Sequence, residues 1–164
     1  LPVMLYDIPG RTGVRITDET LARLAEHERI LAVKDATGDV EQGFRRMEAT
    51  GLEYYSGDDG LNFAWLAHGA SGVVSVVAHA DAHSWREMIT EVDAGDLAGA
   101  RAVARRIRPL VQAIMGGGQG AVMAKEALLL QGRIPSAALR LPLVRAEADE
   151  VAALRAVLDA SGLL

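Results

Sequence analysis

The chain has 164 residues, no cysteine, and a formal net charge of −5 from 22 acidic and 17 basic residues. This length fits one ordinary domain with a hydrophobic core. The absence of cysteine excludes a disulfide framework and a thiolate metal site, and the acidic balance argues against a nucleic-acid partner. Half of the residues are hydrophobic but only 4% are aromatic, which favours aliphatic strands covered by Ala- and Leu-rich helices.

One long uncharged stretch needs an explanation other than a membrane span. Between Asp59 and Asp81 there is no acidic residue, lysine or arginine, and the stretch is long enough to cross a bilayer. Polar residues and the glycines at 69 and 72 interrupt it, so a buried helix, a tight turn and a buried strand explain it better. We expect no membrane contact.

The beginning of the chain carries no basic region and no cleavage site typical of a signal peptide. With the lack of cysteine, which suits a reducing compartment, this predicts a cytoplasmic protein. The chain starts inside an apolar run and without Met, so we expect that it was cut from something longer.

The first part of the chain repeats a strand followed by a helix four times. The predicted strands are near-continuous apolar runs at residues 3–8, 30–36, 52–56 and 72–78. The first predicted helix starts at Thr17, a plausible cap, and the next three cover about 40–49, 61–67 and 82–94. The remainder is predicted to be helical at 97–113, 121–130 and 148–160.

Strand–helix units in series predict an α/β fold with a parallel sheet and helices outside it. Two architectures fit: a small doubly wound sheet, or half of an eight-stranded β/α barrel. In both, function lies at the carboxyl ends of the strands. Here these ends are residues 6–12, 34–38, 56–60 and 75–79.

Lys34 is the most informative single residue for chemistry. It lies inside an apolar strand, and strand alternation places Ala32 and Ala36 on its own face. Such small neighbours leave space around the amine, and desolvation favours the neutral form that attacks carbonyl groups. The alternative is a lysine near the strand end that reaches water or pairs with a nearby aspartate.

A tyrosine and an arginine near the end of the first strand are further candidates. Tyr6 offers a phenol that can relay a proton to a carbonyl oxygen or a carbinolamine. Arg11 follows the turn at residues 9–10, and its guanidinium can bind a substrate carboxylate through two hydrogen bonds. Taken alone, each also fits a plain strand tyrosine or a solvated loop arginine.

Other motifs carry weaker signals. His79 and His83 can bind metals, but they straddle a predicted strand–helix junction, so we expect no metal site. The glycine-rich stretch at 116–120 follows a helix and lacks the Lys-Ser/Thr ending of a phosphate loop, which favours a connector. Ser75 and His79 form no nucleophile elbow.

Four segments in order resemble the dihydrodipicolinate synthase family of the class I aldolase/N-acetylneuraminate lyase superfamily. They are YDIPGRTG at 6–13, VKDATG at 33–38, SGDD at 56–59 and GVVSV at 72–76. The closing part, with LRLP at 139–142 and GLL at 162–164, looks like the end of the same family. The resemblance implies a TIM (β/α)8 barrel, with residues 1–95 as its second half and 96–164 as a carboxyl-terminal helical extension.

The resemblance also implies roles for individual residues. Lys34 matches the lysine that forms a Schiff base with pyruvate, and Tyr6 the tyrosine that relays protons during imine formation and cyclisation. Arg11 matches the arginine that receives the carboxylate of L-aspartate 4-semialdehyde. Val74 matches the strand residue whose backbone contacts pyruvate, and Gly57 lies near the same pocket.

The implied reaction condenses pyruvate with L-aspartate 4-semialdehyde to 4-hydroxy-tetrahydrodipicolinate, in lysine and diaminopimelate biosynthesis. No metal or organic cofactor is implied, because the lysine amine serves as the electron sink, and the implied assembly is a homotetramer. The paired-threonine region that holds the pyruvate carboxylate in the family, and the tyrosine that a neighbouring subunit supplies, are missing. We therefore expect the isolated chain to be inactive.

Two alternatives stay open. One is another pyruvate aldolase of the superfamily that acts on a sugar acid, although sialic acid lyases generally lack an arginine at the position of Arg11. The other is a non-catalytic fragment that only assembles with full-length subunits.

Overall fold

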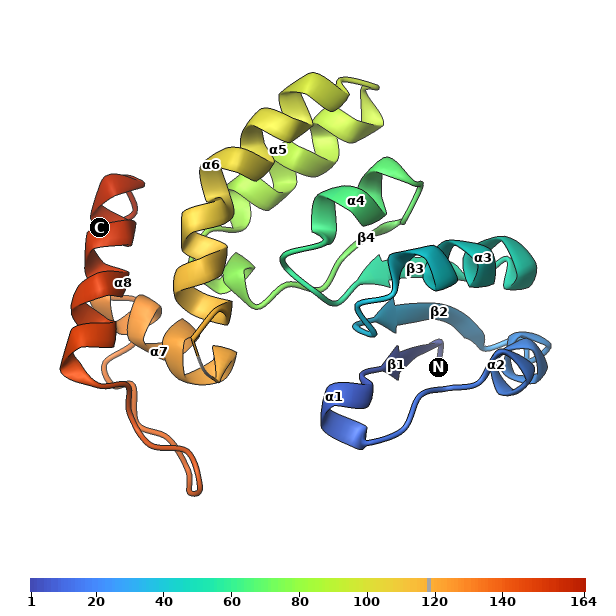
Figure 1. Ribbon diagram of the computed structural model, residues 1–164, viewed down its shortest axis with the longest axis horizontal. Helices are drawn as coiled ribbons and strands as arrows, with labels where there is room; N and C mark the ends of the chain where they lie inside the picture. The colour runs from blue at the N-terminus through green and yellow to red at the C-terminus, as the bar shows by residue number, and fades with distance from the viewer. Residues whose placement is uncertain (118) are drawn as a thin grey trace. The chain divides into compact units, whose positions relative to one another are not determined.

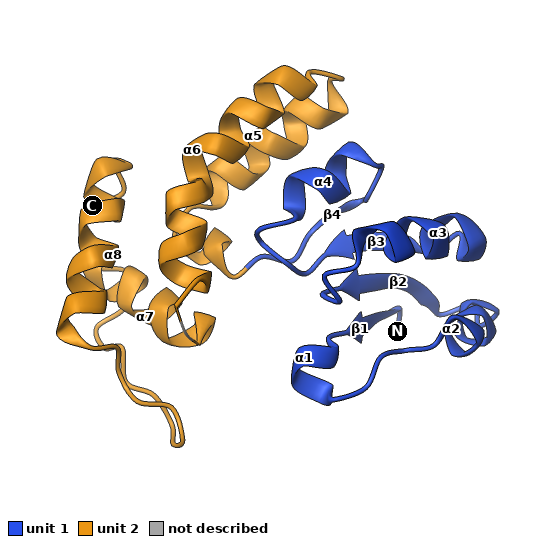
Figure 2. Ribbon diagram, in the orientation of Figure 1, with its two compact units in different colours: residues 1–75 blue, residues 76–164 orange. Residues whose placement is uncertain are grey.

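The structure, a computed structural model, describes residues 1–117 and 119–164. The chain divides into two compact units, Leu1–Ser75 and Val76–Leu164 (Figure 2). The predicted connector at 116–120 includes Gly118, which lies outside the described residues.

The first unit alternates strands and helices along the chain (Figure 1). Its elements are β1 (Val3–Asp7), α1 (Pro9–Thr12), α2 (Asp18–Ala25), β2 (Ile30–Asp35), α3 (Val40–Thr50), β3 (Glu53–Ser56), α4 (Asn62–Ala67) and β4 (Gly72–Val73). The strands form one parallel sheet in the order β1-β2-β3-β4. This sequential order is that of a barrel wall, whereas a doubly wound sheet reverses its order at a switch point.

The two faces of this sheet differ in burial because successive side chains of a strand point to opposite faces. On the helix-covered face, Val33 and Tyr54 pack with Leu21, Leu52 and Trp65 in a core whose members are all nearly inaccessible to solvent. On the other face Met4 and Tyr6 are 42% and 45% exposed. The sheet therefore has a packed outer face and an open inner face.

Side-chain caps place the helix starts where the sequence predicts them. The Thr17 hydroxyl accepts a hydrogen bond from the N–H of Thr20 at 3.2 Å, and an Asp39 carboxylate oxygen accepts one from the N–H of Gln42 at 3.1 Å. Each cap satisfies a backbone donor that the first helical turn leaves unpaired. α3 ends at Thr50, and the next residue, Gly51, has a φ of 66°, a left-handed conformation that favours glycine.

Two local predictions were wrong. The fourth strand was expected to run over residues 72–78, but β4 ends at Val73 because its partner β3 ends at Ser56, the residue paired with Val73. The chain then forms a 3-10 helix, η1 (Val77–His79), which begins inside the segment predicted to be a strand. The turn expected at 9–10 is part of α1, whose first residue, Pro9, has a φ suited to a helix start.

The second unit is helical (Figure 1). Its helices after η1 are α5 (Ala82–Asp93), α6 (Leu97–Met115), α7 (Gly120–Leu130) and α8 (Ala148–Ala160). All four are where the sequence predicts helices, within a few residues. The helices α6 and α8 contact each other, and each buries apolar residues: Ile107 and Ile114 of α6, and Leu154 and Leu158 of α8. The predicted barrel–extension boundary at 95/96 falls between α5 and α6 and stays a prediction.

Within residues 1–117 and 119–164, no helix combines the length and apolar character needed to cross a membrane. In the same residues no group of three or more His, Cys, Asp or Glu side chains is placed to hold a metal ion.

Candidate active site

Lys34 and Tyr6 meet on the open face of the sheet. They are direct neighbours in the parallel register of β2 and β1, and the Lys34 Nζ atom lies 3.9 Å from the centroid of the Tyr6 ring. The ring face attracts the ammonium group, which fixes the amine near the carboxyl end of the strands. An amine there can attack a carbonyl carbon, and the adjacent phenol can give or accept a proton.

Gly57 makes room for the lysine side chain. Its N–H donates to the Asp35 carbonyl at 2.7 Å, directly after β3. A Cβ atom on Gly57 would lie 2.9 Å from Lys34 Cε and 3.0 Å from Lys34 Cγ, closer than carbon atoms pack. The structure thus places Gly57, one of the residues implied by the resemblance, against Lys34, and a larger residue there would force the lysine side chain to shift.

Tyr55 lies on the other side of the lysine and was missed by the sequence analysis. It is the register neighbour of Lys34 in β3, and its hydroxyl donates to Glu53 Oε2 at 3.0 Å. This hydrogen bond to a carboxylate, with some desolvation, raises the pKa of Tyr55. Alternation within the predicted strand at 52–56 was the signal that could have found it.

The remaining two candidates lie beyond the ends of β1 and β4. Arg11 is an exposed residue of α1, directly after β1. Val74 follows β4, is 38% exposed, and donates its N–H to the Ser56 carbonyl at 2.8 Å. The structure places both at the carboxyl edge of the sheet, whereas direct contact with Lys34 is shown for Tyr6 and Gly57.

A buried ionic cluster lies on the opposite face of the same strand ends. Asp7 and Asp35 follow Tyr6 and Lys34 in sequence, are paired in register, and are 2% and 1% exposed. Burial raises the pKa of Asp35, and the charge of Asp7 adds to the increase, while hydrogen bonds from Thr37 and the charge of Arg46 oppose it. No local sequence pattern reveals this cluster, because Arg46 lies on a helix far from Asp7 in the sequence.

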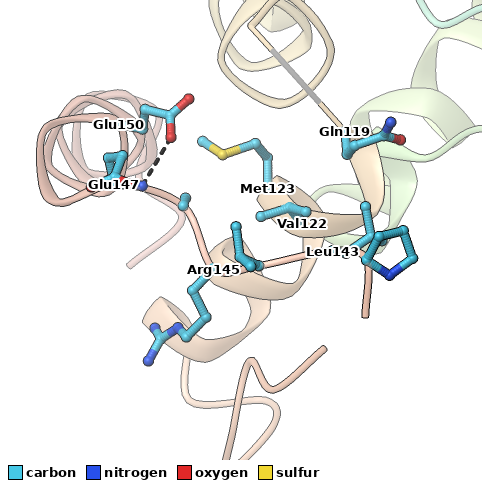
Figure 3. Close-up of a pocket in the computed structure, with 10 residues that line it drawn as sticks. Gln119, Val122, Met123, Leu143, Arg145, Glu147 and Glu150 are labelled. Carbon is cyan, nitrogen blue, oxygen red and sulfur yellow. Dashed lines mark hydrogen bonds between the residues drawn. The ribbon is translucent and has the colours of Figure 1, made fainter. Parts of the chain in front are cut away.

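A separate cavity of about 270 Å³ lies in the second unit between α7 and residues 142–147 (Figure 3). Its lining is mainly apolar, and its charged groups are engaged within the chain. Glu150 accepts a hydrogen bond from the N–H of Glu147 at 2.9 Å, and Arg145 binds the buried Glu126 at 2.7 and 2.8 Å. None of the candidate site residues lines this cavity.

Known proteins resemble this chain along its whole length. Residues 1–161 match the Dihydrodipicolinate synthetase family. The 4-hydroxy-tetrahydrodipicolinate synthase of Kineococcus radiotolerans is 54% identical over 163 residues, which are 99% of this chain and 53% of that protein. The synthase of the same name from Corynebacterium aurimucosum is 49% identical over 165 residues, which are 100% of this chain and 54% of that protein.

Solved structures give the same result. The dihydrodipicolinate synthase of Thermotoga maritima superposes with a TM-score of 0.94 at 37% identity, covering 100% of this chain and 57% of that one. The enzyme of Cyanidioschyzon merolae with lysine bound superposes with a TM-score of 0.91 at 40% identity, covering 100% and 56%. The chain spans about half the length of the curated relatives it matches. It belongs to the dihydrodipicolinate synthetase family and carries part of that family's TIM barrel.

Proposed function

We propose that this chain, as part of a complete barrel, condenses pyruvate with L-aspartate 4-semialdehyde to 4-hydroxy-tetrahydrodipicolinate. One observation carries the proposal: the only lysine of the sheet, Lys34, holds its amine 3.9 Å above the Tyr6 ring at the carboxyl edge. The relatives that share this segment at up to 54% identity bear the name of that synthase.

The chemistry follows from an amine and a phenol on one open face. The neutral Lys34 amine adds to the pyruvate carbonyl carbon, and loss of water from the carbinolamine gives an imine. The protonated imine withdraws electrons from the adjacent methyl group, which loses a proton and adds as a carbon nucleophile to the aldehyde. The amino group that came with the semialdehyde then adds to the imine carbon, which closes the ring and releases the Lys34 amine. Tyr6 moves the protons of these steps, and no cofactor is needed because the imine is the electron sink.

The remaining candidates bind substrate in this proposal. The Arg11 guanidinium receives the carboxylate of the semialdehyde through two hydrogen bonds. Val74 contacts pyruvate through its backbone, and Gly57 leaves the space in which the lysine side chain lies. The proposed enzyme serves lysine and diaminopimelate biosynthesis in the cytoplasm as a homo-oligomer, a tetramer by resemblance.

Covalent trapping tests the proposal. The protein for this test is a hybrid enzyme in which our chain replaces the matching half of the Kineococcus radiotolerans relative. Borohydride reduction in the presence of pyruvate should attach a three-carbon acid to Lys34. Peptide mass spectrometry should find no label on Lys125, the only other lysine of the chain, which lies on α7 and donates to the Ala138 carbonyl.

Two variants complete this test. Lys34→Ala should abolish the label within this chain, and Lys125→Ala, the matched control, should leave it unchanged. A label that persists in this chain after Lys34→Ala would overturn the assignment of Lys34.

A further inference from the structure

Arg46 is a buried arginine that the proposed reaction does not use. It lies on α3, on the helix-covered side of the sheet, and is 6% exposed. Three guanidinium nitrogens meet three acceptors: Nη1 lies 3.2 Å from Asp7 Oδ2, Nε 2.6 Å from Asp18 Oδ1, and Nη2 2.7 Å from the Ile16 carbonyl. Arg46 therefore joins the end of β1, the start of α2 and the segment between them.

The backbone of Ile16 is held from both sides. Its carbonyl accepts from Arg46, and its N–H donates to Asp7 Oδ1 at 3.2 Å. One oxygen of Asp7 thus binds Ile16 while the other binds Arg46. Residues 7 and 16 form the neck of a loop, residues 8–15, which contains α1 and Arg11.

The buried ion pair between Asp7 and Arg46 holds this neck firmly. Asp7 and Arg46 are both almost fully buried, so removing one partner leaves an uncompensated charge in the interior. Only the planar fork of an arginine can serve the three acceptors at once, because an ammonium is a compact point charge on a flexible stem. By contrast, Arg45 on the same helix pairs with Glu41 in an exposed i,i+4 pair, and such pairs contribute little.

The strand residues are fixed independently of this neck. The Ala36 N–H donates to the Asp7 carbonyl at 2.9 Å, and the β1–β2 ladder pairs Tyr6 with Lys34. Loss of Arg46 therefore releases the loop that carries Arg11 while the sheet retains the lysine and the tyrosine.

We propose that Arg46 is a positioning residue that closes the neck of loop 8–15 and thereby fixes Arg11 for the carboxylate of the second substrate. This inference rests on the proposed function, since it assigns Arg46 a part in aldehyde binding through Arg11. The inference predicts different effects for the two substrates. Binding of the semialdehyde depends on Arg46, whereas Schiff-base formation with pyruvate at Lys34 does not.

Steady-state kinetics of the hybrid enzyme test this separation. Arg46→Met should raise the KM for L-aspartate 4-semialdehyde by about tenfold, because small displacements of a binding group are costly. The KM for pyruvate and the borohydride label on Lys34 should change by less than about twofold. Arg45→Met, one residue away on the exposed side of α3, is the matched control and should leave both KM values unchanged.

Two further measurements distinguish positioning from general destabilisation. Hydrogen exchange of a peptide covering 8–17 should speed up in Arg46→Met but not in Arg45→Met, because the Ile16 N–H loses its anchored acceptor. Arg46→Lys, which keeps the charge but not the fork, should give an intermediate semialdehyde KM. Faster exchange without a change in that KM would overturn the positioning role.

A charge-balanced variant covers the case in which Arg46→Met does not fold. Asp7→Asn/Arg46→Met removes the buried carboxylate charge together with the guanidinium, and it should show the same selective rise in the semialdehyde KM. If the double variant or Arg46→Lys folds with an unchanged semialdehyde KM, the inference is wrong. Failure of the unsubstituted hybrid to be labelled by pyruvate would instead refute the proposed function.

Discussion

Lys34 and Asp35 are neighbours in β2, yet their side chains enter opposite environments. Lys34 lies on the open face beside Tyr6, whereas Asp35 is 1% exposed on the helix-covered face, where Thr37 donates to it at 2.8 and 2.9 Å. A one-residue shift of register would exchange these faces. The β1–β2 register therefore determines which of the two groups is available to a substrate.

The first prediction at this scale concerns Arg11. Arg11→Lys keeps the charge but loses the two parallel hydrogen bonds that match a carboxylate. In the hybrid enzyme the KM for the semialdehyde should rise by about tenfold, since one such hydrogen bond is worth about 1.5 kcal/mol. The KM for pyruvate should change much less. Arg45→Lys on exposed α3 is the control, and equal changes in both KM values would mean that Arg11 only organises its loop.

The second concerns the pH dependence of stability. Because the pKa of Asp35 is raised in the folded state, the folded protein binds this proton more readily than the unfolded chain. Asp35 therefore lowers the free energy of unfolding as pH rises from its ordinary pKa of 3.8 through the raised value. Asp35→Asn should remove this part of the decrease while the amide oxygen still accepts from Thr37. Urea unfolding of the hybrid across this pH range measures the free energy of unfolding at each pH, with the exposed Asp93→Asn as control. If Asp35→Asn leaves the pH dependence of the unfolding free energy unchanged, the prediction is wrong.

At the scale of elements, close packing of α3 against α4 organises the outer face. The Trp65 ring of α4 is 1% exposed and lies edge-on to Phe44 with ring centroids 5.3 Å apart. It also stacks on Tyr54 of β3 at 5.8 Å. This arrangement depends on Gly43 of α3, where a Cβ atom would lie 2.1 Å from Trp65 Cη2. Glycine at this helical position thus lets an indole ring contact the helix backbone.

The prediction at this scale concerns Gly43. Gly43→Ala should destabilise the hybrid by about 1–3 kcal/mol, because the added methyl group overpacks a core that has no space for it. Gly10→Ala is the matched control, since a Cβ atom on Gly10, a helical glycine of α1, meets no atom within 4 Å. Denaturant unfolding measures both. A Gly43→Ala variant as stable as Gly10→Ala would show that Trp65 moves aside without cost.

At the scale of the whole molecule, the parallel sheet has two edges and an open face. β1 and β4 each pair with one strand of the sheet, and four strands cannot close a barrel. Unpaired strand edges promote association with other chains. The chain spans about half the length of its curated relatives.

The prediction at this scale is complementation. Expressed alone, the chain should aggregate and lack synthase activity, because substrate positioning, which can supply several kcal/mol of catalysis, is incomplete. Co-expression with a separate chain that covers the first half of the Kineococcus radiotolerans relative should restore activity. Size-exclusion chromatography and a coupled assay of both samples test this. A soluble, monomeric and fully active isolated chain would refute the half-barrel interpretation.

The sequence by itself determined the strand–helix units, the Thr17 cap of α2, the helices of the second unit and the family. These features depend on residues close together in the chain: apolar runs, side chains that cap the next turn, and short motifs. The same local patterns singled out Lys34 and Tyr6, because strand ends of a parallel sheet converge at one edge.

Only the tertiary structure decided the features that need a distant partner. β4 ends at Val73 because β3 supplies no further partner, although the β-branched residues after it favour a strand. The Arg46 side chain binds Asp18, Ile16 and Asp7, which lie 28, 30 and 39 positions away in the sequence. Patterns among neighbouring residues cannot predict such contacts. Asp7 and Arg46 are buried as a pair, and either charge alone in the interior would be strongly destabilising, so this pair forms only in the folded unit.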